Sequence, residues 1–378
     1  MKSRHVIFCF FFCLLTGTGL FFAGNARALE WDYSGRLSGW ITETTDHDSW
    51  QNSLGLLYIP QVSLKKYLGE ESFLDAEVSV KGFGMVMSEE SEEDLSLKLY
   101  RAKLRYATAQ TETRLGLQKI NFGPARLLRP LRWFDRLDPS DPLQLTDGVY
   151  ALRFKYNALN NSNFWLWSLY GNDEPKGYEI FSTVSDSAEF GGRLQHPVPL
   201  GELAASFHTR KVDGSSFNIP NYTENRFALD GRWDIGVGLW FESVFQHQST
   251  AVIPNDWTKL ITAGLDYTFG IGSGLYFLLE HMATAFSDEA LGWDEAVHVS
   301  AVMLNYPVTL TDNLTAIGYY SWDRKKYYQY LSWQRTYDYL ILNLSLFYYP
   351  RTGGQSLGLD QNFFEGGYGA RFMIIFNH

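Results

Sequence analysis

Apolar and polar residues alternate with a period of two along much of the chain. The pattern is clear in residues 74–81, 226–233 and 261–269, where apolar side chains interleave with charged or hydroxyl-bearing ones. Successive side chains of an extended strand point to opposite faces, so each segment predicts a strand with one apolar and one polar face. The chain is therefore expected to be all-β.

The spacing of these runs predicts the number of strands. From Leu29 onward about 18 runs follow one another, separated alternately by short turns and by longer polar loops. The short turns include residues 234–236 and 270–272, and the longer loops include residues 87–94, 171–187, 211–225 and 351–364. This asymmetry is typical of membrane barrels, whose turns face the periplasm and whose loops face outward. We expect an antiparallel barrel of 18 strands, with 16 as the alternative.

Alternation alone also fits a soluble sandwich, and further features favour a transmembrane barrel. Aromatic residues cluster at strand ends, in residues 319–322 and 347–349, as in the girdles at membrane interfaces. No segment after residue 28 approaches 18 consecutive apolar residues, so only a closed barrel could span a membrane. The last strand, 368–376, resembles the C-terminal signal read by the barrel-insertion machinery, although Asn377 and His378 follow its final aromatic residue. An ordinary edge strand is the alternative.

The N-terminus also favours a barrel, because it has the form of an export signal. A short basic start precedes an apolar run from Val6 to Phe22, and Ala26-Arg27-Ala28 matches a leader-peptidase site. We expect cleavage after Ala28, with residues 1–28 as signal peptide and 29–378 as the barrel. A retained membrane anchor is disfavoured because residues 16–19 interrupt the apolar run.

Composition narrows the possible partners. The whole chain has 32 Lys and Arg against 42 Asp and Glu, and the leader removes three of the bases, which leaves a formal charge of −13. Such an acidic chain disfavours nucleic acid as a partner. Both cysteines, Cys9 and Cys13, lie in the leader, so the remaining chain has none for a disulfide or a thiolate metal site. We expect no cofactor and no metal centre.

One long connection is the candidate constriction. Residues 123–146 form the third external loop by strand order, and we expect this loop to fold into the barrel; the alternative is a loop that stays in solvent. Its charges could hold it in place by ion pairs while leaving guanidinium groups for solutes. The bases are Arg126, Arg129, Arg132 and Arg136, and the acids are Asp135, Asp138 and Asp141.

The residues around this loop resemble those of a known group of proteins. Residues 114–123, the Asp138-Pro139-Ser140-Asp141-Pro142 segment and residues 148–153 are similar to the strand, inward loop and returning strand of proteobacterial porin-like families, including the alginate-export type. The resemblance covers about 40 residues with loose motifs. It implies a barrel with an inserted loop and does not identify a solute.

Basic residues gather on the strands beside the loop. Alternation turns the following side chains toward the lumen: Arg101, Lys103, Arg105, Arg114, Arg153 and Lys155. For the strand near residues 95–106 this requires a bulge at Leu99-Tyr100, with Tyr100 in the outward apolar set. A cationic ring in a narrow passage would select anions. The alternative is that these bases pair with lumen acids such as Asp75 and Glu77.

These features predict a water-filled channel in the bacterial outer membrane for small polar solutes, with anions favoured. The expected partners are outer-membrane lipid and lipopolysaccharide, the insertion machinery and small solutes, and both a monomer and a homotrimer remain open. We expect no enzyme, because none of the seven histidines after the leader lies in a motif of a known barrel hydrolase. The alternatives are a barrel enzyme of the lipase or protease type and a non-conducting scaffold or adhesin.

Overall fold

The computed structural model describes residues 29–45, 50–87, 93–215, 218–248, 250, 255–350 and 367–378. The predicted signal peptide lies outside the described residues, as do the whole loop predicted at 351–364 and part of the one predicted at 87–94. Among the described residues, no helix has the length and apolar character needed to cross a membrane.

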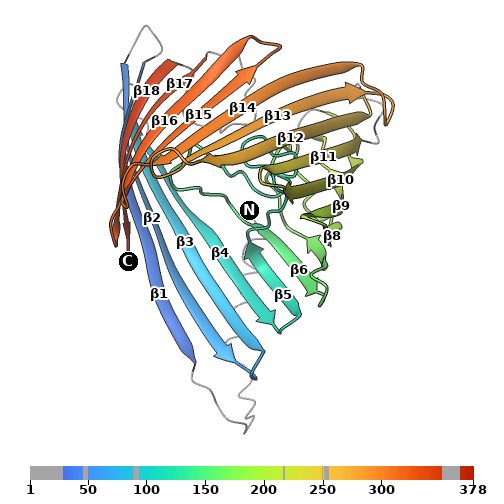
Figure 1. Ribbon diagram of the computed structural model, residues 1–378. Helices are drawn as coiled ribbons and strands as arrows, with labels where there is room; N and C mark the ends of the chain where they lie inside the picture. Colours follow the sequence, from blue (N-terminus) through green and yellow to red (C-terminus); the bar gives the residue numbers. More distant parts are fainter. Residues whose placement is uncertain are drawn as a thin grey trace.

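The chain forms 18 antiparallel strands closed into one barrel (Figure 1). The strands are β1 (Glu30–Thr45), β2 (Trp50–Tyr67), β3 (Phe73–Met87), β4 (Glu93–Ala107), β5 (Thr111–Gln118), β6 (Val149–Asn157), β7 (Asn163–Leu169), β8 (Glu189–Val198), β9 (Gly201–Val212), β10 (Tyr222–Asp234), β11 (Gly238–Gln248), β12 (Trp257–Phe269), β13 (Leu275–Ser287), β14 (Glu295–Pro307), β15 (Asp312–Ser321), β16 (Lys326–Thr336), β17 (Leu340–Tyr349) and β18 (Gly367–Asn377). Each pairs with its neighbours in sequence, and β1 pairs with both β2 and β18. The prediction of 18 strands is confirmed.

The two ends of the barrel differ in the length of their connections. Short connections, such as residues 235–237 and 337–339, join strands at one end, and longer ones, such as 119–148 and 170–188, join them at the other. By the rule for outer-membrane barrels, the short turns mark the periplasmic end and the long connections the outer end.

Each strand has an inner and an outer face, as the alternation predicted. In β6, Ala151 is 5% exposed and faces inward, whereas its neighbour Leu152 is 48% exposed and faces outward. Exposed leucine, phenylalanine and tyrosine side chains recur on the outer face around the whole barrel. An apolar exterior of this kind matches the hydrocarbon layer of a membrane.

The predicted bulge in β4 is present. Ser79 of β3 pairs with Arg101, but the next residue, Val80, pairs with Leu99, so Tyr100 is the extra residue. A bulge reverses the phase of the strand, which explains how leucines 95, 97 and 99 and the later apolar residues of β4 all face outward. One detail of the prediction was wrong: Tyr100 itself packs against an inner cluster beside Leu145, because the bulge turns it away from the outward set.

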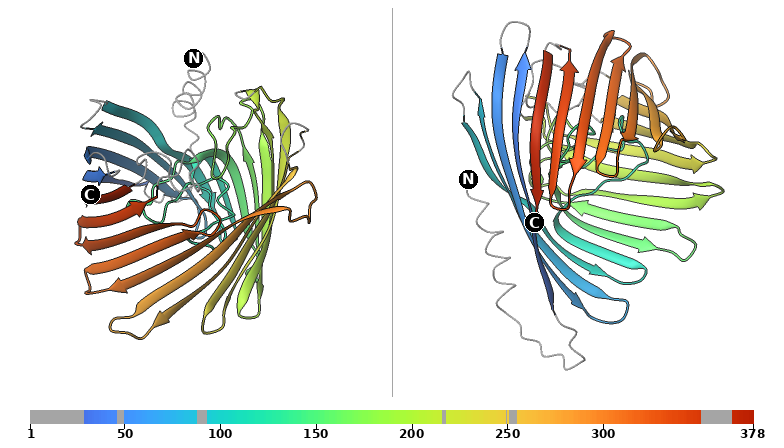
Figure 2. Two further views of the ribbon diagram at one scale, coloured as in Figure 1. Left: turned by 90° about the horizontal axis from the view of Figure 1, so that it is seen from above. Right: turned by 60° about the vertical axis from the view of Figure 1, so that its left-hand side comes forward.

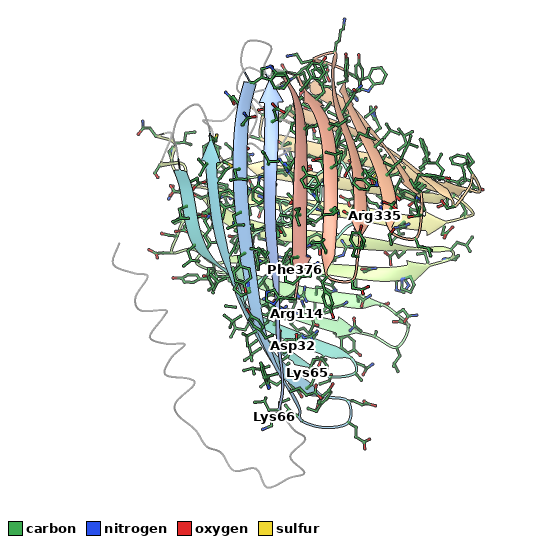
Figure 3. The ribbon with its side chains drawn as sticks, turned by 90° about the vertical axis from the view of Figure 1, so that its left-hand side faces the viewer. Asp32, Lys65, Lys66, Arg114, Arg335 and Phe376 are labelled. Atoms are coloured by element: carbon green, nitrogen blue, oxygen red, sulfur yellow. The ribbon has the colours of Figure 1, made fainter. Side chains whose placement is uncertain are left out.

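The last strand closes the barrel up to the final residue. Phe376, labelled in Figure 3, pairs with Leu37 of β1. His378 then donates its backbone N–H to the carbonyl oxygen of Gly35 (3.0 Å) and accepts from the N–H of Gly35 (2.8 Å). A Cβ at Gly35 would lie 2.5 Å from Nε2 of His378, so a larger residue at this position would clash with the imidazole ring. The residues after the last aromatic therefore belong to the closure.

A closed hydrogen-bonded ladder should resist detergent until it is heated. Because the barrel has no free strand edge, we expect the unheated protein in mild detergent to migrate differently from the boiled protein on a denaturing gel. Far-ultraviolet circular dichroism of the unheated form should be dominated by strand. Identical migration before and after boiling, with a helical spectrum, would contradict the closed barrel.

Candidate constriction and anion site

The segment between β5 and β6, residues 119–148, lies inside the barrel as predicted. Seen from above, it crosses the space within the ring of strands (Figure 2, left). Its apolar residues Ile120, Leu131 and Trp133 are at most 2% exposed and join a cluster with Trp167 of β7 and Val244 of β11. The lumen is thus filled in part by this segment, which we call the constriction loop.

One buried carboxylate on the inner face of β13 captures a turn of the constriction loop. Glu280 accepts the backbone N–H groups of Arg126 (2.7 Å), Leu127 (2.9 Å) and Leu128 (2.6 Å), and the indole N–H of Trp240 (3.0 Å). Its side chain is fully buried. Three of the four hydrogen bonds at this carboxylate come from the loop, so Glu280 anchors the turn.

A second buried carboxylate, on β11, holds the loop on either side of that turn. Glu242 accepts the N–H of Ala125 on one oxygen (2.8 Å) and that of Leu131 on the other (3.0 Å). Gly123 passes directly beside it with φ of +96°, and a Cβ there would lie 2.3 Å from the carboxylate. The sequence did not indicate the role of either acid, because alternation predicts that a glutamate faces inward but not whether it meets water or a loop.

A second connection also folds inward, although the sequence indicated only an ordinary external loop. The segment 170–188, between β7 and β8, packs on the constriction loop. The guanidinium group of Arg132 lies 4.4 Å from the centre of the Tyr178 ring, and Arg136 donates through Nη2 to the carbonyl oxygen of Pro175 (2.8 Å). The two segments therefore form one unit within the lumen.

A buried ion network fastens this second segment to the wall. Glu179, within the segment, pairs with Arg210 of β9 (3.1 Å) and Arg226 of β10 (2.9 Å), and both arginines also pair with Glu224 (2.7 and 2.6 Å). All four side chains are at most 4% exposed. Two acids and two bases alternate here, so the group carries no net charge of its own and acts as a structural anchor.

The four predicted loop arginines are not gathered toward the basic strands. Arg129 forms a buried two-bond pair with Asp135 (2.6 and 3.1 Å) within the loop. Arg126 extends toward β13, where its guanidinium lies 6.0 Å from the Tyr276 ring. The other two loop arginines contact the second segment, as described above. The four loop arginines therefore contact the two inward segments and β13.

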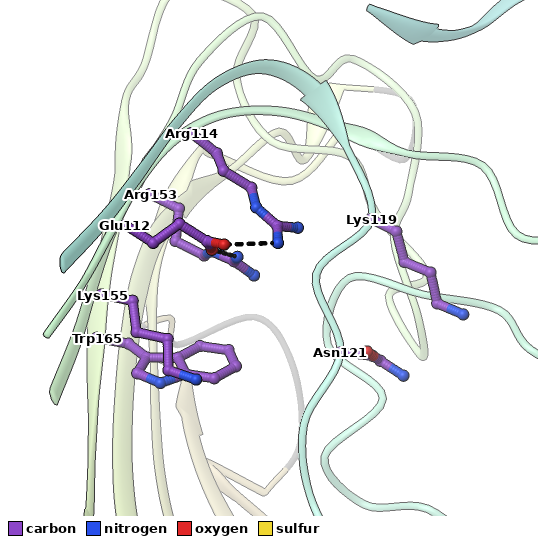
Figure 4. A pocket seen from close by; sticks show the side chains of 7 residues that line it. All are labelled: Glu112, Arg114, Lys119, Asn121, Arg153, Lys155 and Trp165. Atoms are coloured by element: carbon purple, nitrogen blue, oxygen red, sulfur yellow. Dashed lines mark hydrogen bonds and ion pairs between the residues drawn. The ribbon is translucent and has the colours of Figure 1, made fainter. Parts of the chain in front are cut away.

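The predicted basic strands meet around one acid that the sequence reasoning did not single out. Glu112 of β5 lies 2.9 Å from Arg114, 2.5 Å from Arg153 and 3.5 Å from Arg105, so it bridges three neighbouring strands. Figure 4 shows its carboxylate between Arg114 and Arg153. Glu112 and Arg114 are two residues apart on β5, so alternation predicts that both face the lumen. The pairing register of β4, β5 and β6 then brings the three guanidinium groups to Glu112.

Lys103 and Arg105 pair with acids of the neighbouring strand β3. Lys103 lies 2.8 Å from Glu77, and Arg105 lies 2.5 Å from Asp75. Arg101 instead donates to the returning end of the constriction loop, at the carbonyl oxygen of Thr146 (2.8 Å). Lys103 and Arg105 therefore join β4 to β3, and Arg101 joins the wall to the loop.

A cavity of about 390 Å³ lies between this wall and the start of the constriction loop. It is lined by Glu112, Arg114, Lys119, Asn121, Arg153, Lys155 and Trp165. Figure 4 shows Lys119 and Asn121, from the loop, across the space from Lys155 and Trp165. We call it the basic cavity. The loop and strands β5, β6 and β7 all contribute to it.

Two of the lining bases are not neutralised. Within the described part of the chain, neither Lys119 nor Lys155 has an acid within ion-pair distance, and Lys155 lies 5.0 Å from the centre of the Trp165 ring. Partial burial lowers the pKa of Lys119 from its ordinary value, and the attraction of Asp135 only partly offsets this. An anion in the cavity would supply the charge partner that both ammonium groups lack.

Sequence reasoning identified Arg114, Arg153 and Lys155 of this cavity and missed the rest. Lys119 and Asn121 directly follow β5, within residues 114–123, the segment that resembles porin-like families. Trp165 has the inward parity of β7, which a strand-by-strand assignment of faces could have found. No local signal places these residues opposite one another, because the loop brings them there.

The fold matches solved outer-membrane proteins. OccAB4 of Acinetobacter baumannii superposes with a TM-score of 0.60 at 11% identity, over 94% of this chain and 99% of that one. OccD3 (OpdP) of Pseudomonas aeruginosa gives 0.57 at 12%, over 93% of each chain, and an anion-selective porin from Comamonas acidovorans gives 0.51 at 10%, over 93% and 100%. No family model and no curated protein sequence matches the chain. The chain therefore has the closed antiparallel barrel fold of bacterial outer-membrane porins.

Proposed function

We propose that this protein is an outer-membrane porin that lets small anionic solutes diffuse past the constriction loop. The observation that carries the proposal is the basic cavity, where four bases face a single acid. A net positive charge in a narrow polar passage favours anions. The volume of about 390 Å³ suits a solute of a few functional groups.

The negative net charge of the chain does not oppose a preference for anions. Salt screens exposed charges beyond a Debye length of about 8 Å at physiological ionic strength, whereas an ion in the cavity passes within a few ångströms of Lys119 and Lys155. Among the lumen acids, Asp75 and Glu77 are paired with bases. The local field is therefore set by the unpaired bases.

The apolar exterior supports a location in the outer membrane, with lipid and lipopolysaccharide around the barrel and with the last strand read by the insertion machinery. The predicted signal peptide would direct the export. A trimer, the alternative to a monomer, is the form described for the similar OmpT of Vibrio cholerae. The likeness to the alginate-export type stays a prediction.

Reversing the charge of the two unpaired bases should change the selectivity of the pore. In a planar bilayer under a salt gradient, we expect the wild type to prefer anions. The double variant Lys119→Glu and Lys155→Glu should shift the reversal potential toward cations, because both new charges line the passage.

The matched control makes the same change of charge away from the lumen, with Lys66→Glu and Lys325→Glu, both exposed. This control should keep the wild-type reversal potential. A wild type that prefers cations, or a cavity variant that behaves like the control, would contradict an anion passage through the basic cavity.

A further inference from the structure

The outer surface carries a hydrogen-bonded polar cluster across β13, β14 and β15, which lie side by side in Figure 1. Its centre is His281 and Ser300, which pair directly across β13 and β14. Their chain neighbours Glu280 and Val299 are buried on the lumen side, so the opposite parity turns both residues outward. A hydrogen-bonded polar cluster here is unexpected, because exposed apolar side chains recur on the outer face around the whole barrel.

The cluster has the geometry of a nucleophile with an oriented base. Ser300 Oγ lies 2.9 Å from Nδ1 of His281, and Nε2 of His281 lies 3.3 Å from Nδ1 of His298. If the serine donates to His281 Nδ1, then Nε2 carries the ring proton and can donate to His298. A hydroxyl, a base within hydrogen-bond reach and a third group that orients the base are the elements of nucleophilic catalysis.

Two further groups complete the surroundings of the serine. The indole N–H of Trp322 donates to Ser300 Oγ (2.9 Å), so the hydroxyl accepts from the indole and keeps its own proton for His281. Asp323 accepts the backbone N–H of His298 (2.6 Å) and fixes the strand that carries the orienting ring. None of these groups contributes to the basic cavity or to the loop anchors.

The strand register places the cluster at the membrane interface. Ser300 pairs with Tyr320, and Tyr320 pairs with Tyr327 of β16. The girdle continues through ring contacts from Tyr327 to Tyr348 (5.7 Å) and from Tyr348 to Tyr368 (4.7 Å). Aromatic girdles mark the boundary between hydrocarbon and headgroups, which is the depth of the ester bonds of lipids.

We propose that Ser300 is the nucleophile of an outward-facing esterase site that cleaves acyl esters of lipids in the outer leaflet. The proton of Ser300 passes to His281 as Oγ bonds to the ester carbonyl carbon. The ester C–O bond then breaks, and the leaving alcohol oxygen takes the proton from His281. Water repeats the sequence on the acyl-serine, which releases the fatty acid and restores the serine. This activity is independent of the proposed channel.

The test uses the folded full-length protein in a detergent without ester bonds. A fluorophosphonate probe should label the wild type, and mass spectrometry should locate the adduct on Ser300. Fatty-acid release should be measured from vesicles of phosphatidylethanolamine and, separately, from lipopolysaccharide, which distinguishes the two sources of acyl ester. Ser300→Ala should abolish label and release, and His281→Gln should lower release by about 100-fold or more, as for loss of a general base.

Two variants separate catalysis from structure. His298→Asn keeps an acceptor near Nδ1 and should retain most of the kcat, whereas His298→Ala should lower kcat with little change in KM. The matched control is His247→Gln, at an outward histidine whose ring contacts Trp257 of β12, and it should behave as the wild type. No adduct on Ser300, no release from either lipid, or release that persists in Ser300→Ala would overturn the proposal.

Discussion

Replacing Glu242 and Glu280 together with glutamine should release the constriction loop and raise the single-channel conductance. Each carboxylate uses both oxygens to accept loop N–H groups, so an amide NH₂ would face donors at one of the two positions. A buried group left unpaired costs about 1–3 kcal/mol, which corresponds to roughly a 5- to 150-fold shift from docked to undocked loop. Planar-bilayer recordings should show larger and noisier currents.

A loop deletion and an exposed double variant give the upper and lower limits of the expected rise in conductance. Deleting residues 123–146 should give the upper limit of conductance, provided that the barrel still shows heat-dependent migration. The exposed pair Glu43→Gln and Glu202→Gln makes the same two substitutions without touching the loop and should leave the current unchanged. If only the deletion raises the conductance, other contacts hold the loop. If neither does, the passage does not run beside it.

Removing Glu224 should cause the largest loss of stability. Its carboxylate pairs with Arg210 and Arg226 and accepts from Gln246, all within the buried wall of β9, β10 and β11. Loss of Glu224 leaves the two buried guanidinium groups with Glu179 as the one acid they share in this group, and breaking a buried ion pair costs about 3–5 kcal/mol. We expect Glu224→Ala to lower the free energy of unfolding by this amount, measured by urea titration in lipid or detergent.

The control for this prediction is an exposed acid of the same type. Glu202→Ala, which loses an exposed hydrogen bond from Gln195, should cost at most about 1 kcal/mol. Equal stability of the two variants would mean that water enters the wall of β9, β10 and β11 and replaces the missing carboxylate. The second inward segment would then be held by its contacts with the constriction loop.

The sequence alone predicted the strand number, the two faces of each strand and the bulge in β4. These features depend on near neighbours in the chain, because the parity of a side chain decides its face. The phase change between Leu99 and Ala102 is visible in a short stretch of residues. The inward path of the constriction loop followed from strand order and from the resemblance of the flanking residues.

Only the tertiary structure decided which inner side chains meet. Glu112 and Glu280 are both inward glutamates within apolar alternation, yet one bridges three arginines and the other binds three loop N–H groups. On the outer face, parity alone would turn His281 and Ser300 toward lipid, but their contact depends on the β13–β14 register. Partners across a closed barrel are set by register and by loop crossings, which join residues far apart in the chain and leave no local pattern.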